Sequence, residues 1–364
     1  MRSIAFFVKT FEGGGAQRVM ATLARQFILE NHQVSIVTMF HAESYSLPSE
    51  VEMFNLEIDR NDLSIEHNAK KIEKAFLFLK KRNVDTVIIG STSAPLYKYA
   101  LEIRKKHEFR IIAQMTNDPN QSPRTQKLRD ERDVVFEELN NVHSGFVFQT
   151  PFERDYFGPE IAKRSVIINN PIMDFAYCPY KGKRRRAIVA AGRLDEQKNF
   201  SLLLRAFALF CDVVPDYRLE IYGRGHMETI LRNEAETLRI ADKVDFCGFQ
   251  LDWQKNLVDC SMFVQSSDYE GVSNVLLEAL CLGVPTISTD CPAYGARMFA
   301  EDGQSILLVP VGDEKKLSDA MIKLANEPSL SKRMSELSVK ICDGLRVENI
   351  ARQYFRYFDE LDRC

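Results

Sequence analysis

The sequence predicts an α/β protein made of two doubly wound domains that face each other across a cleft. The chain has 364 residues, which is too long for one ordinary core and suits two domains of roughly 180 residues each. In both halves, short apolar runs of strand length alternate with stretches of helical periodicity, the pattern of a parallel sheet covered by helices. Polar, glycine-containing turns follow several strands, at the sheet edge where ligands bind.

Composition excludes several classes of protein. Apolar residues make up 45% and charged residues 27% of the chain, as in soluble globular proteins. The formal net charge is −3, so the overall charge does not favour nucleic acid as a partner. No apolar run approaches the ~20 residues of a transmembrane helix. The N-terminus has the pattern of a first strand rather than of a signal peptide, so we expect a cytoplasmic protein.

The cysteines and histidines do not indicate a metal site. All eight cysteines lie at or beyond Cys178 without a CxxC pair, and most belong to apolar segments. We therefore expect buried, reduced thiols rather than zinc ligands or disulfides. The six histidines are scattered, and none has a second histidine or a carboxylate at metal-ligand spacing.

A βαβ unit is predicted at the start of the chain, with strands at 2–9 and 34–39 around a helix at 16–30. Gly13, Gly14 and Gly15 precede the helix, and without Cβ atoms their backbone can approach a ligand closely. A dinucleotide fingerprint fails because Arg18 stands where its third glycine belongs. A purely structural glycine turn remains the alternative.

The remaining elements define the domain boundaries. In the first half, strands are expected at 86–89, 110–113, 146–149 and 166–168, with helices at 68–82, 95–107 and 122–139. In the second half, strands are expected at 187–191, 217–222, 244–246, 262–264 and 286–288. We assign Rossmann-like domains to 1–170 and 187–344, a linker to 171–186, and a final helix at 345–364 that crosses back to the first domain.

The segment 266–285 runs from a strand through a polar turn into a helix. Ser273 is a natural N-cap, so the amides of Asn274, Val275 and Leu276 would project from the helix start, where a phosphate can accept from them. Glu270 in the turn and Glu278 in the helix would accept hydrogen bonds from hydroxyls on either side of a diphosphate. The alternative is an N-capped amphipathic helix with two solvated glutamates.

Two cations flank the first turn of the second domain. Arg193 offers a planar fork and Lys198 a mobile point charge, and together they could neutralise a diphosphate. No Asp-x-Asp occurs in the chain, so a metal-bound diphosphate has no evident ligand pair. The charge of a leaving group would then be met by these cations and the helix start, with no metal required. Two solvated cations in a turn are the alternative.

These motifs together resemble the retaining glycosyltransferases of family 4, which have the GT-B fold. The resemblance is carried by the glycine-rich run from Gly13 to Arg18, by Gly192-Arg193 with Lys198, and by Glu270 and Glu278 before Gly283-x-Pro285. It spans nearly the whole chain. It implies an N-terminal acceptor-binding domain and a C-terminal domain that binds a nucleotide sugar.

The resemblance also implies roles for individual residues. Arg193 and Lys198 would hold the donor diphosphate, Glu278 the ribose, and Glu270 the transferred sugar, for which positioning is favoured over a nucleophilic role. Arg193, Lys198 and Glu270 are the candidate catalytic residues. The wider donor site comprises Gly14, Gly15, Arg193, Lys198, Gly248, Phe249, Gln250, Glu270, Gly271, Ser273, Asn274, Val275, Leu276 and Glu278. Within it, the segment Gly248 to Gln250 would lie where the family holds the nucleotide base.

One loop departs from the family pattern. Many members carry a histidine after the strand that matches 111–113, but here Met115 or a neighbour stands in its place. Methionine cannot donate a hydrogen bond, so Thr116, Asn117 or Asp118 would serve instead, or the donor sugar differs from the common ones. We expect Asn117 and Asp118 on the acceptor side.

A basic run suggests a further partner. Between residues 66 and 132 there are fifteen Lys and Arg but eight Asp and Glu, and Ile72, Ala75, Phe76 and Leu79 recur at helical spacing. A basic amphipathic helix can lie on the anionic inner face of a cell membrane. An ordinary surface helix with its apolar side inward is the alternative.

The resemblance thus implies a retaining transfer of a hexose or N-acetylhexosamine from a nucleotide diphosphate sugar, with a UDP-sugar expected. The acceptor would be a glycan or a polyprenyl-linked glycan in surface polysaccharide or lipopolysaccharide biosynthesis. A nucleotide-sugar epimerase or hydrolase on the same fold, and a non-catalytic nucleotide-sugar-binding subunit, remain alternatives.

Overall fold

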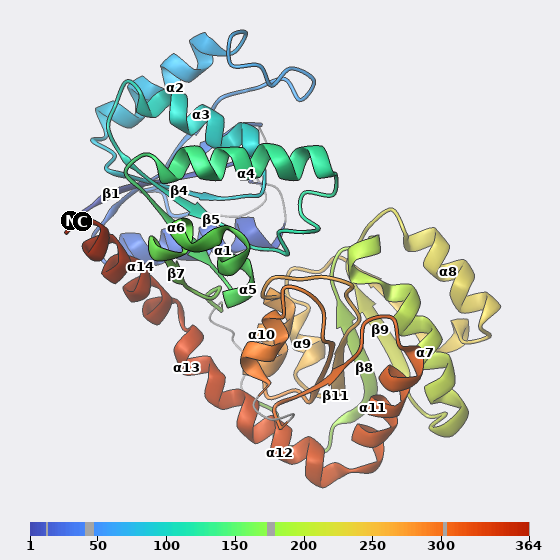
Figure 1. Cartoon of the computed structure of the whole chain (residues 1–364). Helices are drawn as coiled ribbons and strands as arrows, with labels where there is room; N and C mark the ends of the chain where they lie inside the picture. Colours follow the sequence, from blue (N-terminus) through green and yellow to red (C-terminus); the bar gives the residue numbers. More distant parts are fainter. Residues whose placement is uncertain (12–13, 41–46, 173–178, 301–303, 364) are drawn as a thin grey trace. The chain divides into compact units, whose positions relative to one another are not determined.

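The computed structural model describes the chain except residues 12–13, 41–46, 173–178, 301–303 and 364. Its contacts divide the chain into two compact units. Unit 1 comprises Met1–Met173 with Leu345–Cys364, and unit 2 comprises Asp174–Gly344. Each unit contains one parallel sheet with helices on it (Figure 1), which confirms the predicted α/β class.

The sheet of unit 1 has seven strands in the order β3-β2-β1-β4-β5-β6-β7, and every paired neighbour runs parallel. The strand order reverses between β1 and β4, which creates a topological switch point. The strands are β1 Ser3–Val8, β2 Gln33–Thr38, β3 Glu52–Asn55, β4 Thr86–Gly90, β5 Arg110–Gln114, β6 Ser144–Phe148 and β7 Ser165–Ile167.

Helices cover both faces of this sheet. Alternation along β1 illustrates the two layers, because Ala5 and Phe7 belong to one apolar core and Ile4 and Phe6 to the other. The helices of unit 1 are α1 Gly15–Leu29, α2 Ala69–Lys81, α3 Ala94–Arg104, α4 Gln126–Asn140, α5 Pro151–Tyr156, α6 Gly158–Lys163 and α14 Val347–Leu361.

The last helix, α14, packs beside α1 on the sheet of unit 1 (Figure 1). Its Tyr354 lies edge-on to Phe27 of α1. The Tyr357 hydroxyl accepts a hydrogen bond from Phe146 N at 2.8 Å, and Asp362 forms an ion pair with buried Arg110 at 2.6 Å. Apolar packing and buried polar contacts therefore hold the C-terminal end of the chain on this unit.

The sheet of unit 2 has six parallel strands in the order β10-β9-β8-β11-β12-β13. Its order reverses between β8 and β11, so a second switch point lies there. The strands are β8 Arg185–Ala191, β9 Arg218–Tyr222, β10 Val244–Gly248, β11 Cys260–Gln265, β12 Thr286–Thr289 and β13 Ile306–Val309.

The helices of unit 2 surround a core dominated by α7, in which Phe207 and Phe210 are fully buried. The helices are α7 Phe200–Val213, α8 Glu228–Thr237, α9 Gln254–Leu257, α10 Asn274–Cys281, α11 Glu314–Asn326, α12 Pro328–Ser338 and α13 Cys342–Leu345, of which the last residue already belongs to unit 1. Short 3₁₀ helices are η1 Glu196–Lys198, η2 Ala241–Lys243, η3 Gly295–Phe299 and η5 Val339–Ile341.

The cysteine prediction was wrong for one pair. Cys281 of α10 and Cys342 of α13 are joined as a disulfide, and their separation of 61 residues gives no spacing signal in the sequence. Cys211, Cys260 and Cys291 are buried free thiols. Burial raises the pKa of Cys260 and of Cys291 to about 12. Cys178 and Cys364 lie outside the described residues.

Within the described part of the chain, no helix is both long enough and apolar enough to cross a bilayer.

Candidate functional site

Two loops of unit 2 follow the strands on either side of its switch point. Residues 192–199 follow β8, and residues 266–273 follow β11. Because β8 and β11 are parallel neighbours, their carboxyl ends lie at one edge of the sheet. The sequence placed Arg193, Lys198 and Glu270 in these two loops, so the topology brings the predicted catalytic residues into one region.

Hydrogen bonds join the two loops directly. Asp268 N donates to Gln197 O at 2.9 Å, and the Ser266 hydroxyl donates to Lys198 O at 2.9 Å. The Asn199 side chain donates to Asp268 Oδ1 at 2.7 Å, while its own Oδ1 caps α7 by accepting from Leu202 N at 3.1 Å. The loops therefore form one connected structure rather than two independent turns.

An ion pair with little exposure to solvent lies between the loops. The Lys198 ammonium contacts Glu270 Oε1, and the two side chains are 14% and 11% exposed. The Ser267 hydroxyl donates to the same oxygen at 2.8 Å. Glu270 N also donates to Pro292 O at 2.5 Å, which fixes the backbone on the other side of the loop. Burial strengthens the attraction within such a pair but also makes loss of either partner costly.

Arg193 is the exposed cation of this region. Its side chain is 68% exposed and lies 3.3 Å from Asp195 Oδ2. It also donates to Gln197 Oε1 at 3.3 Å. An exposed guanidinium with long, weak contacts retains most of its hydrogen-bonding capacity for a ligand.

Gln197 is a residue of this site that the sequence prediction missed. Its side chain is buried, and its Nε2 donates to Tyr269 O at 3.0 Å and to Glu270 Oε2 at 3.3 Å. Only its position next to Lys198 could have singled it out, because its partners belong to a loop some 70 residues later in the chain.

Helix α10 begins at the end of the second loop. Ser273 occupies the N-cap position with extended backbone angles, but its side chain makes no capping hydrogen bond. The predicted N-cap position of Ser273 is therefore confirmed, without a capping hydrogen bond from its hydroxyl. The amides of Val275 and Leu276, in the first turn, donate to no acceptor within the described residues. They remain available to an anion at the helix start.

Glu278 is held separately from Glu270. Its side chain is 2% exposed, and its Oε2 accepts a hydrogen bond from Gln254 Nε2 of α9 at 3.0 Å. The sequence prediction assigned ligand hydroxyls to Glu278 and did not include Gln254, whose amide contacts this buried carboxylate in the structure. Gln254 therefore helps to orient this carboxylate.

Close backbone contacts leave room only for glycine beside the loops. A Cβ on Gly223, which has φ +145°, would lie 1.8 Å from Gly192 O. A Cβ on Gly295 would lie 2.0 Å from Gly271 O. Side chains at either position would push the site loops away from their neighbours.

The segment Gly248 to Gln250, predicted to contact the nucleotide base, lies at the carboxyl end of β10. Gly248 has φ +68°, and its carbonyl accepts from Gly223 N at 2.9 Å. Phe249 is 50% exposed, and Gln250 Nε2 donates back to Cys247 O at 3.2 Å. An exposed aromatic ring at this edge offers a surface on which a base can stack.

The predicted residues of unit 1 lie after β1 and β5. Gly14 has extended backbone angles and directly precedes α1, with Gly15 as the first residue of the helix. Gly13 lies outside the described residues. Met115 is fully buried in an apolar core, so it does not occupy a position from which it could contact a sugar.

Asn117 and Asp118 form a turn that hydrogen-bonds largely to itself. Asn117 Oδ1 accepts from Asp118 N at 2.9 Å, and Asp118 Oδ1 accepts from Asn120 N at 2.9 Å. Asp118 is buried, and this burial raises the pKa of its carboxyl above the ordinary value. Arg132 of α4, itself fully buried, donates to Pro119 O at 2.9 Å and so fixes the turn from inside.

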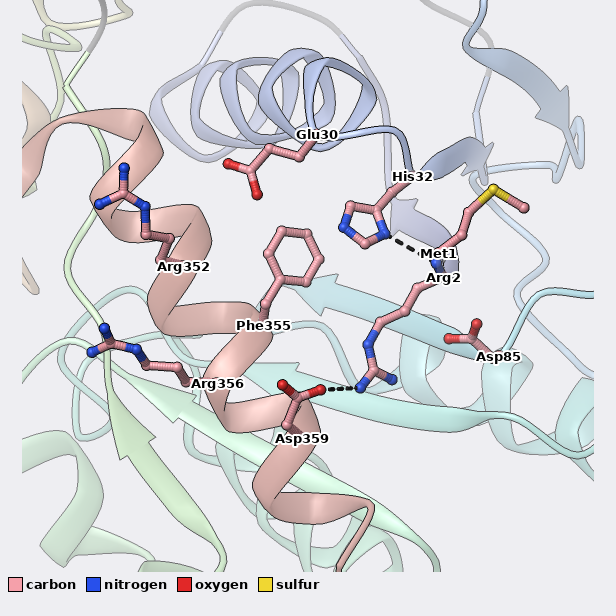
Figure 2. Close-up of a pocket in the computed structure, with 9 residues that line it drawn as sticks. All are labelled: Met1, Arg2, Glu30, His32, Asp85, Arg352, Phe355, Arg356 and Asp359. Atoms are coloured by element: carbon pink, nitrogen blue, oxygen red, sulfur yellow. Dashed lines mark hydrogen bonds and ion pairs between the residues drawn. The ribbon is translucent and has the colours of Figure 1, made fainter.

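A hollow of about 680 Å³ lies at the opposite edge of the unit 1 sheet (Figure 2). Arg2 and His32 come just before β1 and β2, so the hollow is at the amino ends of these strands. Arg2 N donates to His32 Nδ1 at 3.0 Å, and the His32 ring stacks on Phe355. The Arg2 guanidinium pairs with Asp359 at 2.6 Å. These polar groups hold α14 on the sheet, and the predicted site residues of unit 1 lie at the other edge.

Metal ligands are not clustered in the described part of the chain. No group of three or more His, Cys, Asp or Glu side chains there could hold a metal ion.

Comparisons with known proteins address the family and the fold. Residues 180–340 match the family described as glycosyl transferases group 1. A relative from Campylobacter jejuni, "GalNAc-alpha-(1->4)-GalNAc-alpha-(1->3)-diNAcBac-PP-undecaprenol alpha-1,4-N-acetyl-D-galactosaminyltransferase", is 26% identical over 99% of this chain and 99% of its own length.

Solved structures resemble the chain over its full length. Sucrose-phosphate synthase from Thermosynechococcus elongatus has a TM-score of 0.83 at 16% identity and covers 100% of both chains. A TarM variant from S. aureus, in complex with fondaparinux, alpha-GlcNAc-glycerol and UDP, has a TM-score of 0.82 at 14% identity, over 98% of this chain and 100% of that chain. At such identities the similarity concerns the fold, and it confirms the predicted GT-B class.

Proposed function

Because the chain is a glycosyltransferase whose residues 180–340 belong to the group 1 family, we propose that it transfers a hexose or N-acetylhexosamine from a UDP-sugar, with retention. The acceptor is a hydroxyl of a glycan or lipid-linked glycan. The observation that carries the proposal is the Lys198–Glu270 pair beside Arg193 at the switch point of unit 2. An epimerase, a hydrolase and a non-catalytic binding subunit are not favoured.

The donor diphosphate is held by cations and backbone amides. Arg193 offers its exposed guanidinium fork, and Lys198 supplies a point charge next to it. The amides of Val275 and Leu276 donate to the distal phosphate at the start of α10. As the bond to the sugar breaks, the charge that grows on the leaving phosphate is stabilised by these groups, and no proton donor is required for that step.

The two glutamates accept hydrogen bonds from hydroxyls. Glu270 orients the transferred sugar and Glu278 the ribose, each already held by an amide, Gln197 and Gln254 respectively. The base lies against the segment Gly248 to Gln250, where Phe249 is exposed. In a retaining reaction without a protein nucleophile, the leaving phosphate takes the proton of the acceptor hydroxyl on the same face of the sugar. Glu270 acts by positioning.

On the acceptor side we place Asn117 and Asp118, while Gly14 and Gly15 belong to the wider donor site that the family resemblance implies. Asp118 is buried and shapes the turn, whereas Asn117 is partly exposed and is the side chain that meets the acceptor. The relative named above has an undecaprenol-linked substrate in its name and aligns over 99% of both chains. This supports a polyprenyl-linked glycan as the acceptor, in lipopolysaccharide or surface polysaccharide biosynthesis.

The test of the donor is UDP release from a panel of UDP-sugars with chelator present, together with calorimetric binding of UDP. We expect one sugar to be turned over in the chelator, and retention is checked from the anomeric configuration of the product by NMR. Absence of UDP binding, or turnover that chelator abolishes, would contradict the metal-independent donor site. Release of an epimerised sugar, with no transfer to an acceptor, would favour a nucleotide-sugar epimerase.

A basic surface of unit 1 supports contact with an anionic membrane. Helix α2 exposes Lys70, Lys74, Lys80 and Lys81 around Leu77, which is 54% exposed. Helix α3 packs beside α2 and adds Lys105 and Lys106 at its end, although these pair with Glu102 and Glu73. Lysines around an exposed leucine suit a surface that carries both acidic headgroups and apolar chains.

Sedimentation with vesicles tests this contact. We expect binding to phosphatidylglycerol-containing vesicles and little to phosphatidylcholine, with roughly fivefold weaker binding for each of Lys70→Glu and Lys74→Glu. Lys332→Glu replaces an exposed lysine of α12 in unit 2; it is the matched control and should bind like the unaltered protein. Equal binding by all three variants would contradict the assignment.

A further inference from the structure

The carboxylate of Glu270 has neutral hydrogen-bond donors as well as a charged one. Lys198 and the Ser267 hydroxyl both donate to Oε1, and Gln197 Nε2 donates to Oε2 at 3.3 Å. Gln197 and Ser267 are buried. Each carboxylate oxygen therefore has one neutral donor that does not depend on the cation.

The Gln197 amide also connects Glu270 to Arg193. Its Nε2 is shared between Glu270 and Tyr269 O, while its Oε1 accepts from Arg193 at 3.3 Å. The amide orientation is consistent with all three contacts, because its nitrogen faces two acceptors and its oxygen faces a donor. One side chain thus lies between the proposed diphosphate cation and the proposed sugar-binding carboxylate.

Donor binding would change the partners of Glu270. A diphosphate carries several negative charges, and it would attract the Lys198 ammonium, at the end of a flexible side chain, away from the carboxylate. A buried carboxylate that loses its cation is destabilised unless other donors replace it. Two neutral donors are already in place for that state.

On the basis of the proposed function, we propose that Gln197 and Ser267 are positioning residues that hold Glu270 in its sugar-binding orientation when Lys198 turns to the donor diphosphate. They occupy one lone-pair site on each carboxylate oxygen and leave the others for sugar hydroxyls. Neither touches the reacting atoms, so both act through Glu270.

A double-mutant cycle tests this dependence on Glu270. Turnover of the UDP-sugar selected by the panel is measured for Gln197→Ala, Ser267→Ala, Glu270→Ala and the two double variants. We expect about 10- to 100-fold slower turnover for Gln197→Ala and for Ser267→Ala, as for loss of a hydrogen bond to a charged group. In the Glu270→Ala background, neither substitution should slow turnover further by more than about threefold.

A structural role predicts a different result. If Gln197 or Ser267 only joined the two loops, its substitution would slow turnover by the same factor with or without Glu270. A double variant whose loss of turnover equals the product of the two single losses would overturn the inference. Where the double variants are too slow to measure, the ratio of the affinities for UDP-sugar and for UDP, from calorimetry, gives the same comparison. Unchanged turnover in both single variants would also overturn it.

Two controls complete the design. Ser267→Thr retains the hydroxyl and should keep more activity than Ser267→Ala, while Asn233→Ala removes an exposed amide of α8 and should behave like the unaltered protein. The proposed function fails separately, if the unaltered protein neither binds UDP nor turns over a UDP-sugar. If the unaltered protein binds UDP and turns over a UDP-sugar, but the losses of turnover in the double variants are the products of the single losses, only the positioning role is overturned.

Discussion

Glu270 and Glu153 are both buried glutamates, one in each unit, yet their surroundings differ. Glu270 contacts Lys198, Ser267 and Gln197 across two loops. Glu153, in the first turn of α5, accepts from Gln149 N at 2.7 Å through one oxygen, and its other oxygen has no hydrogen-bond partner within the described residues. One buried glutamate, Glu270, is thus part of an ion-paired cluster in unit 2, and the other, Glu153, is part of a capped helix start in unit 1.

This difference teaches that burial of a carboxylate does not by itself identify a site. Thr150 Oγ1 accepts from Glu153 N at 3.1 Å, and the Glu153 carboxylate accepts from Gln149 N, one residue before the N-cap, in an arrangement that resembles a capping box. Burial raises the pKa of Glu153 to about 8, and the nearby Asp118 charge contributes to this shift. We therefore assign Glu153 to stability and Glu270 to donor binding.

The largest expected effect comes from breaking the cluster around Glu270. Glu270→Ala and Lys198→Ala should each lower turnover about 100-fold or more, on the scale of losing one preorganised stabilising group. Thermal unfolding checks that each variant remains folded, because removing one member of a buried pair leaves the other unpaired. Wild-type-like turnover in either variant would contradict the assignments.

A smaller effect, on stability alone, is expected from Glu153→Gln. The folded protein keeps Glu153 protonated up to about pH 8, whereas the unfolded chain ionises it above about pH 4.3. Unfolding thus releases a proton in this window, and the stabilising contribution of Glu153 is lost as pH rises from about 4.3 toward 8. Glutamine does not titrate. The melting temperature of the variant minus that of the unaltered protein should therefore increase between pH 5 and pH 8.

Melting temperatures measured across this range for both proteins check the expectation. Glu160→Gln replaces an exposed glutamate of α6, side-chain exposure 68%, and its difference from the unaltered protein should stay flat. If the melting temperatures of Glu153→Gln and of the unaltered protein change in parallel with pH, the Glu153 carboxyl is ionised in the folded protein and the expectation is contradicted.

The alternation of strands and helices, and the turns that follow β1, β8 and β11, could be predicted from the sequence, because periodicity and glycine are local signals. The short strands β3 and β13 were missed. Gln197, Ser267 and Gln254 were missed for a different reason. Their roles arise from contacts between segments that are distant in the chain, and nothing in the residues themselves signals such contacts. The burial of Met115 and the Cys281–Cys342 pair likewise depend on tertiary packing.

The most direct test of the account compares UDP binding by two variants, one in each unit. Arg193→Ala removes an exposed guanidinium from the loop after β8 and should weaken calorimetric UDP binding about tenfold or more, as for loss of a charge-assisted contact. Asn117→Ala, in the loop after β5, should leave the Kd for UDP unchanged within about twofold while it lowers transfer to the acceptor. Equal losses in both variants, or none in Arg193→Ala, would contradict a donor site in unit 2.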